Sequence, residues 1–295
     1  EEMCDWFHQK DFWLIADVSP VTLDVFGEDS LISLASRLHL DSLRLDFGFN
    51  LEEIKQNNPS LSFSYNASTI LEEKSVEKNA LYMHNFYPRP ETALDDSFFC
   101  SLNEKIKKNE GRITAFIVGD KEKRGPIYEG LPTLEKHRYA SPYAQYVDLL
   151  ENYSVDQVFL GDLELSDFEF DLIMAYLKDQ KIRIPVTFNE KNINLYHQLF
   201  TVRVDSPSSL IRVQESREDA QQGPAIKKKN IRERVKGSVT MDNENYLRYS
   251  GEVQITKADY PKDDKVNVIG QVKEYYHLLL DNLHNGEKFI FVPVK

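Results

Sequence analysis

The feature that most constrains the fold is an alternation of apolar, β-rich runs with helical patterns over residues 1–180. Apolar runs bounded by polar turns indicate strands, and segments with apolar residues at helical spacing follow most of them. Such an alternation predicts parallel strands joined by right-handed helical crossovers. The expected strands cover residues 13–18, 42–47, 61–66, 81–86, 113–118 and 157–162, and the expected helices cover residues 31–38, 69–78, 95–109, 143–152 and 167–177.

Polar side chains stand at the carboxyl ends of five of these strands, and a Gly-Asp pair directly follows the remaining one. The residues are Asp17, Asp46, Asn66, His84 with Asn85, Gly119 with Asp120, and Asp162. In a barrel of parallel strands these ends converge on one mouth, where such enzymes hold their sites. Asp and Asn are also favoured helix N-caps, so each of these residues taken alone is either a site residue or a helix cap. The same feature on every strand favours a shared site.

The stretch of residues 84–91 follows the fourth strand and carries imidazole, amide, phenol, guanidinium and carboxylate groups. Pro88 and Pro90 fix φ on both sides of Arg89 and remove two backbone donors. They also bias Tyr87 and Arg89 away from the helical region. The stretch predicts a stiff polar loop, which is either one wall of a binding site or a rigid turn whose side chains satisfy the local backbone.

A (β/α)8 barrel needs eight strands, two more than this pattern supplies. An open doubly wound sheet usually shows a Gly-rich phosphate loop, which this sequence lacks. Residues 1–10 read as the end of an amphipathic helix, with Met3, Trp6 and Phe7 on one face. We therefore expect a TIM-like (β/α)8 barrel whose first two βα units lie upstream of Glu1.

After about residue 180 the pattern changes to alternating or β-branched runs bounded by turns, at residues 199–204, 251–256, 266–269 and 288–292. Only residues 275–282 look helical in this part. The pattern predicts a separate, mainly antiparallel β domain over residues 181–295, after a barrel domain over residues 1–180. The basic residues between positions 227 and 236 read more readily as a solvated loop and strand edge than as an anion site.

Composition limits the partners that the protein can have. The net charge of −12 argues against nucleic acid or an anionic membrane, although a locally basic pocket for a small anion is compatible with it. Cys4 and Cys100 show no metal-ligand spacing and no disulfide framework, which fits a reducing cytoplasm. No apolar run approaches transmembrane length and no signal peptide is visible.

Several long motifs resemble the signature of the bacterial 6-phospho-N-acetylmuramidase family. The longest are HNFYPRPET at residues 84–92 and KRGPIYEGLPTLEKHR at residues 123–138. Residues 15–20, 43–48, 66–69, 237–243 and 249–257 fit the same pattern. The resemblance covers essentially the whole chain.

The resemblance implies a TIM-barrel glycosidase domain followed by a cyclophilin-like β-barrel domain. It implies cleavage of the β-1,4 bond between N-acetylmuramic acid 6-phosphate and N-acetylglucosamine, in the cytoplasmic recycling of peptidoglycan. The family's barrel has two further strands before the strand that ends at Asp17, in agreement with the strand count. The expected partner is the phosphorylated amino-sugar disaccharide, with no cofactor, metal, nucleic acid or membrane, and the oligomeric state is left open.

Glycoside hydrolysis generally uses two carboxyl groups, or one carboxyl together with the substrate's own N-acetyl oxygen. The leading catalytic candidates are Asp17, Asp46 and Asp162, because strand ends hold side chains more rigidly than loops do. Glu129 follows them, since glycine and proline residues frame it in a loop long enough to reach over the mouth. The sequence leaves open which carboxyl is the acid and whether the reaction retains or inverts configuration.

Two further sets of residues complete the expected site. Residues expected to bind the sugar are Asn66, His84, Asn85, Tyr87, Glu91, Asp120 and Tyr128. His84 could be a general base or an oriented hydrogen-bond donor, and Glu91 or Glu129 could instead pair with an arginine. Residues expected to bind the 6-phosphate are Arg89, Lys123, Arg124, His137 and Arg138. Arg89 leads this set because its flanking prolines restrict it and its planar fork suits phosphate oxygens.

Two other functions remain open on the sequence alone. A barrel lyase or isomerase acting on a phosphorylated sugar would use Asp17, His84 and Asp162 as metal ligands, although no His-x-His pair is present. A non-catalytic sugar-phosphate binding protein would keep the barrel and use the β domain as a surface for a partner.

Overall fold

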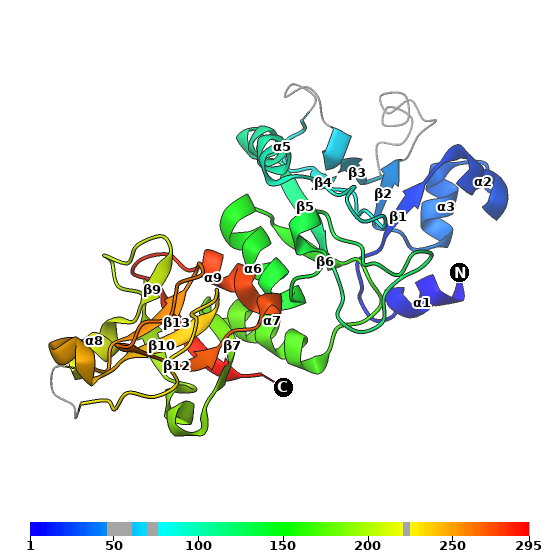
Figure 1. The fold of residues 1–295 in the computed structure, drawn as a ribbon. Helices are drawn as coiled ribbons and strands as arrows, with labels where there is room; N and C mark the ends of the chain where they lie inside the picture. Colours follow the sequence, from blue (N-terminus) through cyan, green and yellow to red (C-terminus); the bar gives the residue numbers. More distant parts are fainter. Residues whose placement is uncertain (46–60, 70–75, 221–224, 295) are drawn as a thin grey trace. The chain divides into compact units, whose positions relative to one another are not determined.

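The structure is a computed structural model that describes residues 1–45, 61–69, 76–220 and 225–294. The chain divides into two compact units (Figure 1). The first unit comprises Glu1–Phe86, Leu94–Phe116 and Ser154–Phe159. The second unit comprises Tyr87–Ala93, Ile117–Tyr153 and Leu160–Lys295.

A parallel sheet is built from the first half of the chain. Its strand order β1-β2-β3-β4-β5-β6 is the order along the chain, and the pairs from β1 to β5 are all parallel. The strands are β1 (Ile15–Val18), β2 (Ser42–Leu45), β3 (Phe63–Asn66), β4 (Leu81–Met83), β5 (Arg112–Ile117) and β6 (Gln157–Leu160). Every strand lies on a run that the sequence predicts, so the expectation of an α/β protein with a parallel sheet is confirmed.

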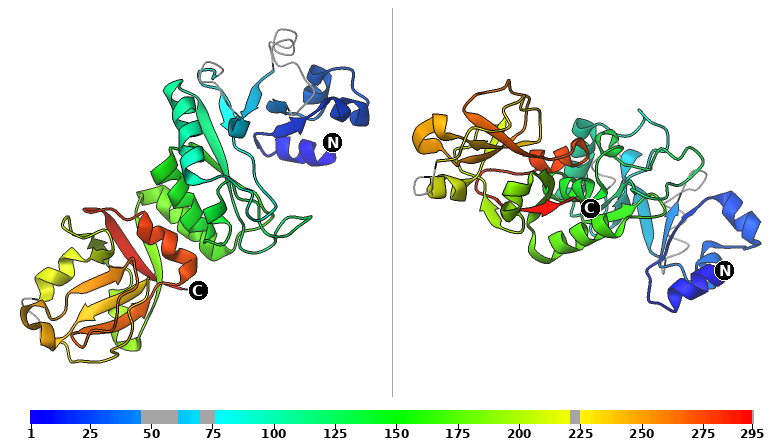
Figure 2. Two further views of the ribbon diagram at one scale, coloured as in Figure 1. Left: turned by 45° about the horizontal axis from the view of Figure 1, so that its top comes forward. Right: turned by 60° about the horizontal axis from the view of Figure 1, so that its bottom comes forward.

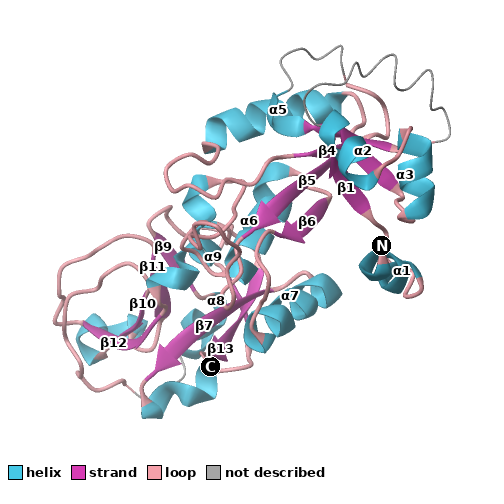
Figure 3. Ribbon diagram, turned by 90° about the vertical axis from the view of Figure 1, so that its right-hand side faces the viewer, coloured by secondary structure: helices cyan, strands magenta, loops and turns pink. Residues whose placement is uncertain are grey.

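Helices alternate with these strands, as the colours of Figure 3 show. They are α1 (Glu2–His8), α2 (Pro20–Phe26), α3 (Leu31–Arg37), η1 (Ala67–Thr69), α5 (Asp96–Lys108), η3 (Glu135–His137), α6 (Pro142–Tyr153) and α7 (Asp167–Asp179). The sequence predicts α3, α5, α6 and α7 but misses α2. Ser19 and Thr22 form a capping box at its start, and Gly27 ends it with φ of 65°. The helix expected at residues 69–78 falls largely outside the described residues.

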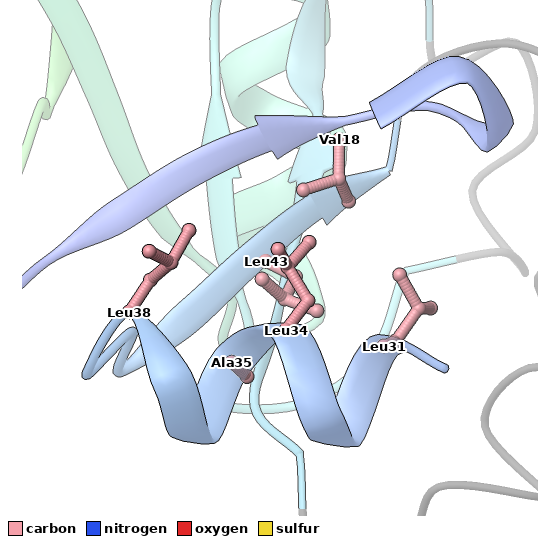
Figure 4. Close-up of a cluster of buried hydrophobic side chains, with 6 residues drawn as sticks. All are labelled: Val18, Leu31, Leu34, Ala35, Leu38 and Leu43. Carbon is pink, nitrogen blue, oxygen red and sulfur yellow. The ribbon is translucent and has the colours of Figure 1, made fainter. Parts of the chain in front are cut away.

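One hydrophobic cluster of the first unit forms between α3 and one face of β1 and β2 (Figure 4). Val18 and Leu43 come from the strands, and the α3 side contributes apolar residues at helical spacing, namely Leu31, Leu34, Ala35 and Leu38. That spacing gives the helix one apolar stripe, which is buried against the sheet. Because strand side chains alternate between faces, the opposite face of β1 and β2 carries a different set of residues.

A second sheet contains seven strands in the order β8-β13-β7-β12-β10-β11-β9. In both views of Figure 2 the yellow-to-red strands of this sheet lie side by side. The strands are β7 (Ile182–Phe188), β8 (Leu199–Thr201), β9 (Leu210–Arg212), β10 (Ser238–Asp242), β11 (Val253–Thr256), β12 (Val266–Gln271) and β13 (Lys288–Pro293). Neighbours are antiparallel except β13 and β7, which are parallel. The expectation of a second, mainly antiparallel sheet is therefore confirmed.

The sequence predicts four of these strands, β8, β11, β12 and β13, but misses β7, β9 and β10. In β7 the alternate residues Ile182, Ile184 and Val186 are all buried, as one face of a strand requires, while Arg183 and Thr187 are more exposed and Pro185 is buried as well. Pro185 obscures that signal, because proline within a run argues against a central strand. The shorter elements of this part are η4 (Glu190–Leu195), α8 (Gln214–Ala220), η5 (Glu244–Tyr249), η6 (Glu274–Tyr276) and α9 (His277–Asp281).

A buried carboxyl group joins this part of the chain to α6 and α7. Glu169 of α7 accepts hydrogen bonds from Ser141 Oγ at 2.6 Å, the Tyr143 N–H at 2.9 Å and the Tyr276 hydroxyl at 2.8 Å. Burial raises the pKa of Glu169, and these three bonds oppose the rise. The contact fixes η6 against α7 within the second unit.

Candidate active site

One face of the parallel sheet is polar toward the carboxyl ends of its strands. In register, Asp17 of β1 pairs with Arg44 of β2, which pairs with Ser64 of β3. Paired residues on adjacent strands project from the same face of a sheet. Val18 and Leu43, one position along, lie in the core beside α3. Asp17, Arg44 and Ser64 therefore share the face opposite α3.

Arg44 links two of the predicted site residues. Its Nη1 lies 3.3 Å from each carboxylate oxygen of Asp17, and its Nη2 donates to Asn85 Oδ1. The Arg44 side chain is 13% exposed, whereas the Asp17 side chain is 57% exposed. Arg44 Nε is buried and has no hydrogen-bond partner among the described residues. The arrangement presents an oriented, accessible carboxylate beside a partly buried cation whose Nε has no acceptor among the described residues.

His84 is fully buried next to Asn85 and holds the loop in place. Its Nε2 lies 2.8 Å from Asn103 Oδ1 of α5, and its Nδ1 lies 3.3 Å from Ser68 Oγ. Ser68 Oγ accepts the Asn85 N–H at 2.9 Å, and the Ser68 N–H donates to Asn66 Oδ1. Burial lowers the pKa of His84 to about 4, so the ring is neutral near pH 7. Asn66 and His84 use these atoms to position Asn85.

Two predicted carboxylates of the second unit bind backbone. Asp162 is buried, and its two oxygens accept N–H groups from Gly119 at 2.9 Å and Arg124 at 3.0 Å. Asp120 Oδ1 accepts the Ser166 N–H at 2.7 Å. A Cβ at Gly119 would lie 2.5 Å from a carbonyl oxygen of the loop after β6, so this approach requires glycine. Asp162 and Asp120 thus tie the loops that follow β5 and β6 to each other.

Arg138 and Glu135 form a saturated pair that organises two loops. Arg138 is 1% exposed, and Glu135 accepts two of its hydrogen bonds, at 2.6 and 2.8 Å. The other donors reach backbone carbonyls of Tyr87, Arg89, Glu129 and Gly130. Glu135 also accepts the N–H groups of Glu91 and Ala93, each at 3.0 Å.

The Arg138 hydrogen bonds lower the pKa of Glu135 to about 2. A guanidinium has five N–H donors, and all of those of Arg138 have acceptors. The structure therefore gives Arg138 a different task from the predicted phosphate contact. It brings the 87–93 loop and the 129–130 turn side by side.

His137 is likewise buried and contacts a carboxylate. Its Nε2 lies 2.7 Å from Asp148 Oδ2 of α6, and Lys136 Nζ lies 2.8 Å from the same oxygen. Burial alone would raise the pKa of Asp148, but the His137 hydrogen bond and the Lys136 charge outweigh it and lower that pKa to about 2. His137 holds η3 on α6, which differs from the predicted contact with a phosphate.

The remaining candidates of the second unit are accessible. Exposed residues are Arg89, Glu91, Arg124, Tyr128 and Glu129, and half-buried ones are Tyr87 and Lys123. Glu91 and Tyr128 have φ of 69° and 63°, a region that non-glycine residues adopt only where surrounding contacts fix the backbone. These loops therefore hold their side chains in defined positions at the surface.

Asp46 lies outside the described residues. Within the described ranges, no group of three or more His, Cys, Asp or Glu residues could hold a metal ion. No helix of the described chain is long and apolar enough to span a membrane.

Arg44, Ser68, Asn103 and Glu135 are the residues of these networks that the sequence pattern does not single out. The local sequence does predict the face on which Arg44 lies, because Arg44 alternates with two leucines and so must face the same way as Ser42. Ser42 Oγ indeed lies 2.8 Å from Ser64 Oγ on that face. Asn103 has no such signal, because only the tertiary fold brings it from the buried side of α5 to His84.

The parallel sheet, its polar carboxyl ends and the second sheet define a two-part α/β protein with a polar candidate site at the strand ends. The chain belongs to the 6-phospho-N-acetylmuramidase family, as the resemblance of its motifs indicates. The family's N-terminal model matches residues 1–175, and its C-terminal model matches residues 179–292. The family description is that of a glycosidase acting on a phosphorylated sugar.

Two solved structures are similar over 99% of this chain. One is a conserved protein from a locus in Enterococcus faecalis with an unknown function, with a TM-score of 0.81, 29% identity and 83% of that chain covered. Another is an uncharacterized B. cereus protein, with a TM-score of 0.76, 25% identity and 87% of that chain covered. Among curated proteins, no significant match is found.

Proposed function

We propose that the protein is a glycoside hydrolase that cleaves the β-1,4 bond between N-acetylmuramic acid 6-phosphate and N-acetylglucosamine, in the cytoplasmic recycling of peptidoglycan. Membership of the family over both parts of the chain supports this assignment. The observation that carries it is Asp17, an accessible carboxylate oriented by a partly buried arginine at the end of a parallel strand. Enzymes of the barrel class place their chemistry at this position.

The proposed architecture is a TIM-like (β/α)8 barrel of which residues 1–180 supply the last six βα units, followed by a cyclophilin-like domain over residues 181–295. The parallel strand pairs, with strand order equal to chain order, support the barrel. The family's N-terminal model ends at residue 175, which supports a boundary near residue 180. In such a barrel the ends of all six strands face one mouth.

In the proposed mechanism the carboxyl groups have different tasks. Asp17 is ion-paired with Arg44, which suits the charged partner that stabilises or attacks the reacting carbon. Glu129 and Asp46 are the candidates for the proton donor. Asp162 accepts two backbone N–H groups, so we assign it to holding the loop that carries Glu129.

Different protein groups suit the oxygens, the sugar face and the phosphate of the substrate. Asn85 and the unused Nε of Arg44 suit the hydroxyl and acetamido oxygens of the sugar. The exposed ring of Tyr128 suits a sugar face. Arg89, Lys123 and Arg124 are the proposed phosphate ligands, and the Glu135–Arg138 pair fixes the backbone on which Arg89 stands.

Incubation with the phosphorylated disaccharide, followed by mass spectrometry with and without chelator, tests the proposal. We expect release of N-acetylglucosamine that chelator does not affect and that Asp17→Asn abolishes. Asp24→Asn, an exposed aspartate of α2, is the matched control and should retain activity. Chelator-sensitive turnover would assign the protein to a metal-dependent lyase or isomerase, and tight binding without turnover would assign it to a sugar-phosphate binding protein.

A further inference from the structure

A cleft beside the seven-stranded sheet contains none of the residues of the proposed active site. It has a volume of about 720 Å³ and lies between the start of η4, residues 225–230 and strand β12. A second hollow of about 530 Å³ shares Phe188, Asn189, Asn230 and Ile269 with it. Each hollow alone falls within the range of sites for small ligands, and the four lining residues that they share make them neighbours, so an extended ligand could occupy both.

The wall and floor of the cleft suit a ligand that is both apolar and rich in hydrogen-bond donors. Phe188 and Ile269 are buried and supply apolar surface. Asn189 lines both hollows, and its Oδ1 is buried with no hydrogen-bond partner among the described residues. Asn189 is the N-cap of η4 yet makes no side-chain cap hydrogen bond. A buried acceptor without a hydrogen bond is unfavourable, and an N–H group of a ligand would supply that bond.

The rim of the cleft is basic, in a protein of net charge −12. The cationic residues at the two hollows are Lys191, Lys227, Lys228, Lys229 and Arg232, and the acidic one is Glu190. Lys227 and Lys228 pair with Glu244 and Asp264 in exposed salt bridges, which are weak. Lys191, Lys229 and Arg232 form no ion pair with any described residue. The rim therefore has cations left for a ligand.

We propose that this cleft binds a short, extended peptide segment rich in acidic residues. Its carboxylates would meet the basic rim, one apolar side chain would cover Phe188 and Ile269, and a backbone N–H would reach Asn189 Oδ1. Nucleic acid fits less well, because its phosphates require a longer basic track and the rest of the protein is acidic. A small anion would use the rim but leave the floor and Asn189 without contacts.

Fluorescence anisotropy of a fluorescein-labelled octapeptide with alternating glutamate and leucine, titrated with the full chain, tests the proposal. We expect saturable binding that weakens at high salt. The matched peptide with glutamine in place of glutamate should bind about tenfold more weakly, because the rim contributes through charge. Equal affinity for the two peptides, or no saturable binding of the acidic one, would overturn the proposal.

Variants then place the binding in this cleft. The double variant Lys191→Glu with Lys229→Glu should lower affinity for the acidic peptide about tenfold, and Asn189→Ala should lower it severalfold. Lys262→Glu changes an exposed lysine of the same sheet region outside the cleft and should have no effect. The proposal is wrong if the double variant binds the acidic peptide with unchanged affinity. It is also wrong if single-stranded DNA or free phosphate competes more strongly than unlabelled peptide. These variants should retain glycosidase activity, so failure here is separable from failure of the proposed function.

Discussion

Two arginine–carboxylate pairs in this molecule use the same chemical groups for opposite purposes. In the second unit the Arg138 side chain is completely buried and pairs with the partly exposed Glu135, and backbone carbonyls accept from its remaining donors. In the first unit Arg44 holds Asp17 and Asn85, has no acceptor for its Nε among the described residues, and leaves the Asp17 carboxylate largely accessible. The difference shows that saturation of the donors, not the identity of the residues, separates a structural arginine from one that can serve a ligand.

Loss of the saturated pair should have the largest effect. Arg138→Ala leaves four carbonyls without this donor and the Glu135 carboxylate without its charged partner, so we expect the free energy of unfolding to fall by about 4 kcal/mol. Urea denaturation followed by circular dichroism measures it. Arg89→Ala, an exposed arginine in a loop that Arg138 binds, should change stability by less than about 0.5 kcal/mol. If Arg138→Ala were as stable as the parent, the two arginines would not differ as described.

Removal of the open arginine should affect turnover more than stability. Arg44→Met keeps the bulk of the side chain but releases Asp17 and Asn85, so we expect kcat/KM on the phosphorylated disaccharide to fall about a hundredfold, equivalent to about 2.7 kcal/mol. Arg44→Lys should recover part of the loss, because it restores the charge without the fork. Arg112→Met, an exposed arginine of β5, is the control. Parent-like kcat/KM in Arg44→Met would remove Arg44 from the site.

The neutral His84 that supports Asn85 should make the first unit sensitive to acid. The pKa of His84 is about 4 in the folded chain, against about 6.5 when unfolded, so the unfolded chain takes up the proton first. Stability is therefore full above pH 6.5 and is lost as the pH falls toward 4. Between pH 7 and pH 5 the parent should lose about 2 kcal/mol more than His84→Gln in urea denaturation. Identical losses would mean that His84 does not remain neutral when buried.

The smallest effect is expected at the exposed arginine. Arg89→Ala should raise KM for the phosphorylated disaccharide about tenfold, equivalent to about 1.4 kcal/mol, and change KM for the dephosphorylated analogue little. Steady-state kinetics on both substrates measure the ratio. Equal increases on both would show that Arg89 does not contact the phosphate.

The sequence predicts the parallel strands well, because an apolar run followed by a polar residue is a local signal. It points to Asp17 and Asn85 as candidate site residues for the same reason, since both stand at strand ends, and their roles stay predictions. It cannot separate Arg89 from Arg138, which lie in similar loop motifs, because partners far along the chain decide their burial. In the same way, the sequence does not show that His137 pairs with Asp148. It does not predict β7, because a proline lies within an otherwise regular strand.

The Arg138–Glu135 pair also has a consequence for the order of folding. Arg138 binds carbonyls of Tyr87 and Arg89, which lie 51 and 49 residues earlier in the chain. Contacts of such separation require the entropy of closing a long loop before they contribute any stability. The hydrogen bonds from Arg138 to these two carbonyls should therefore form after the transition state for folding has passed. Loss of the pair would then accelerate unfolding and leave the folding rate nearly unchanged, so the pair lengthens the lifetime of the native state.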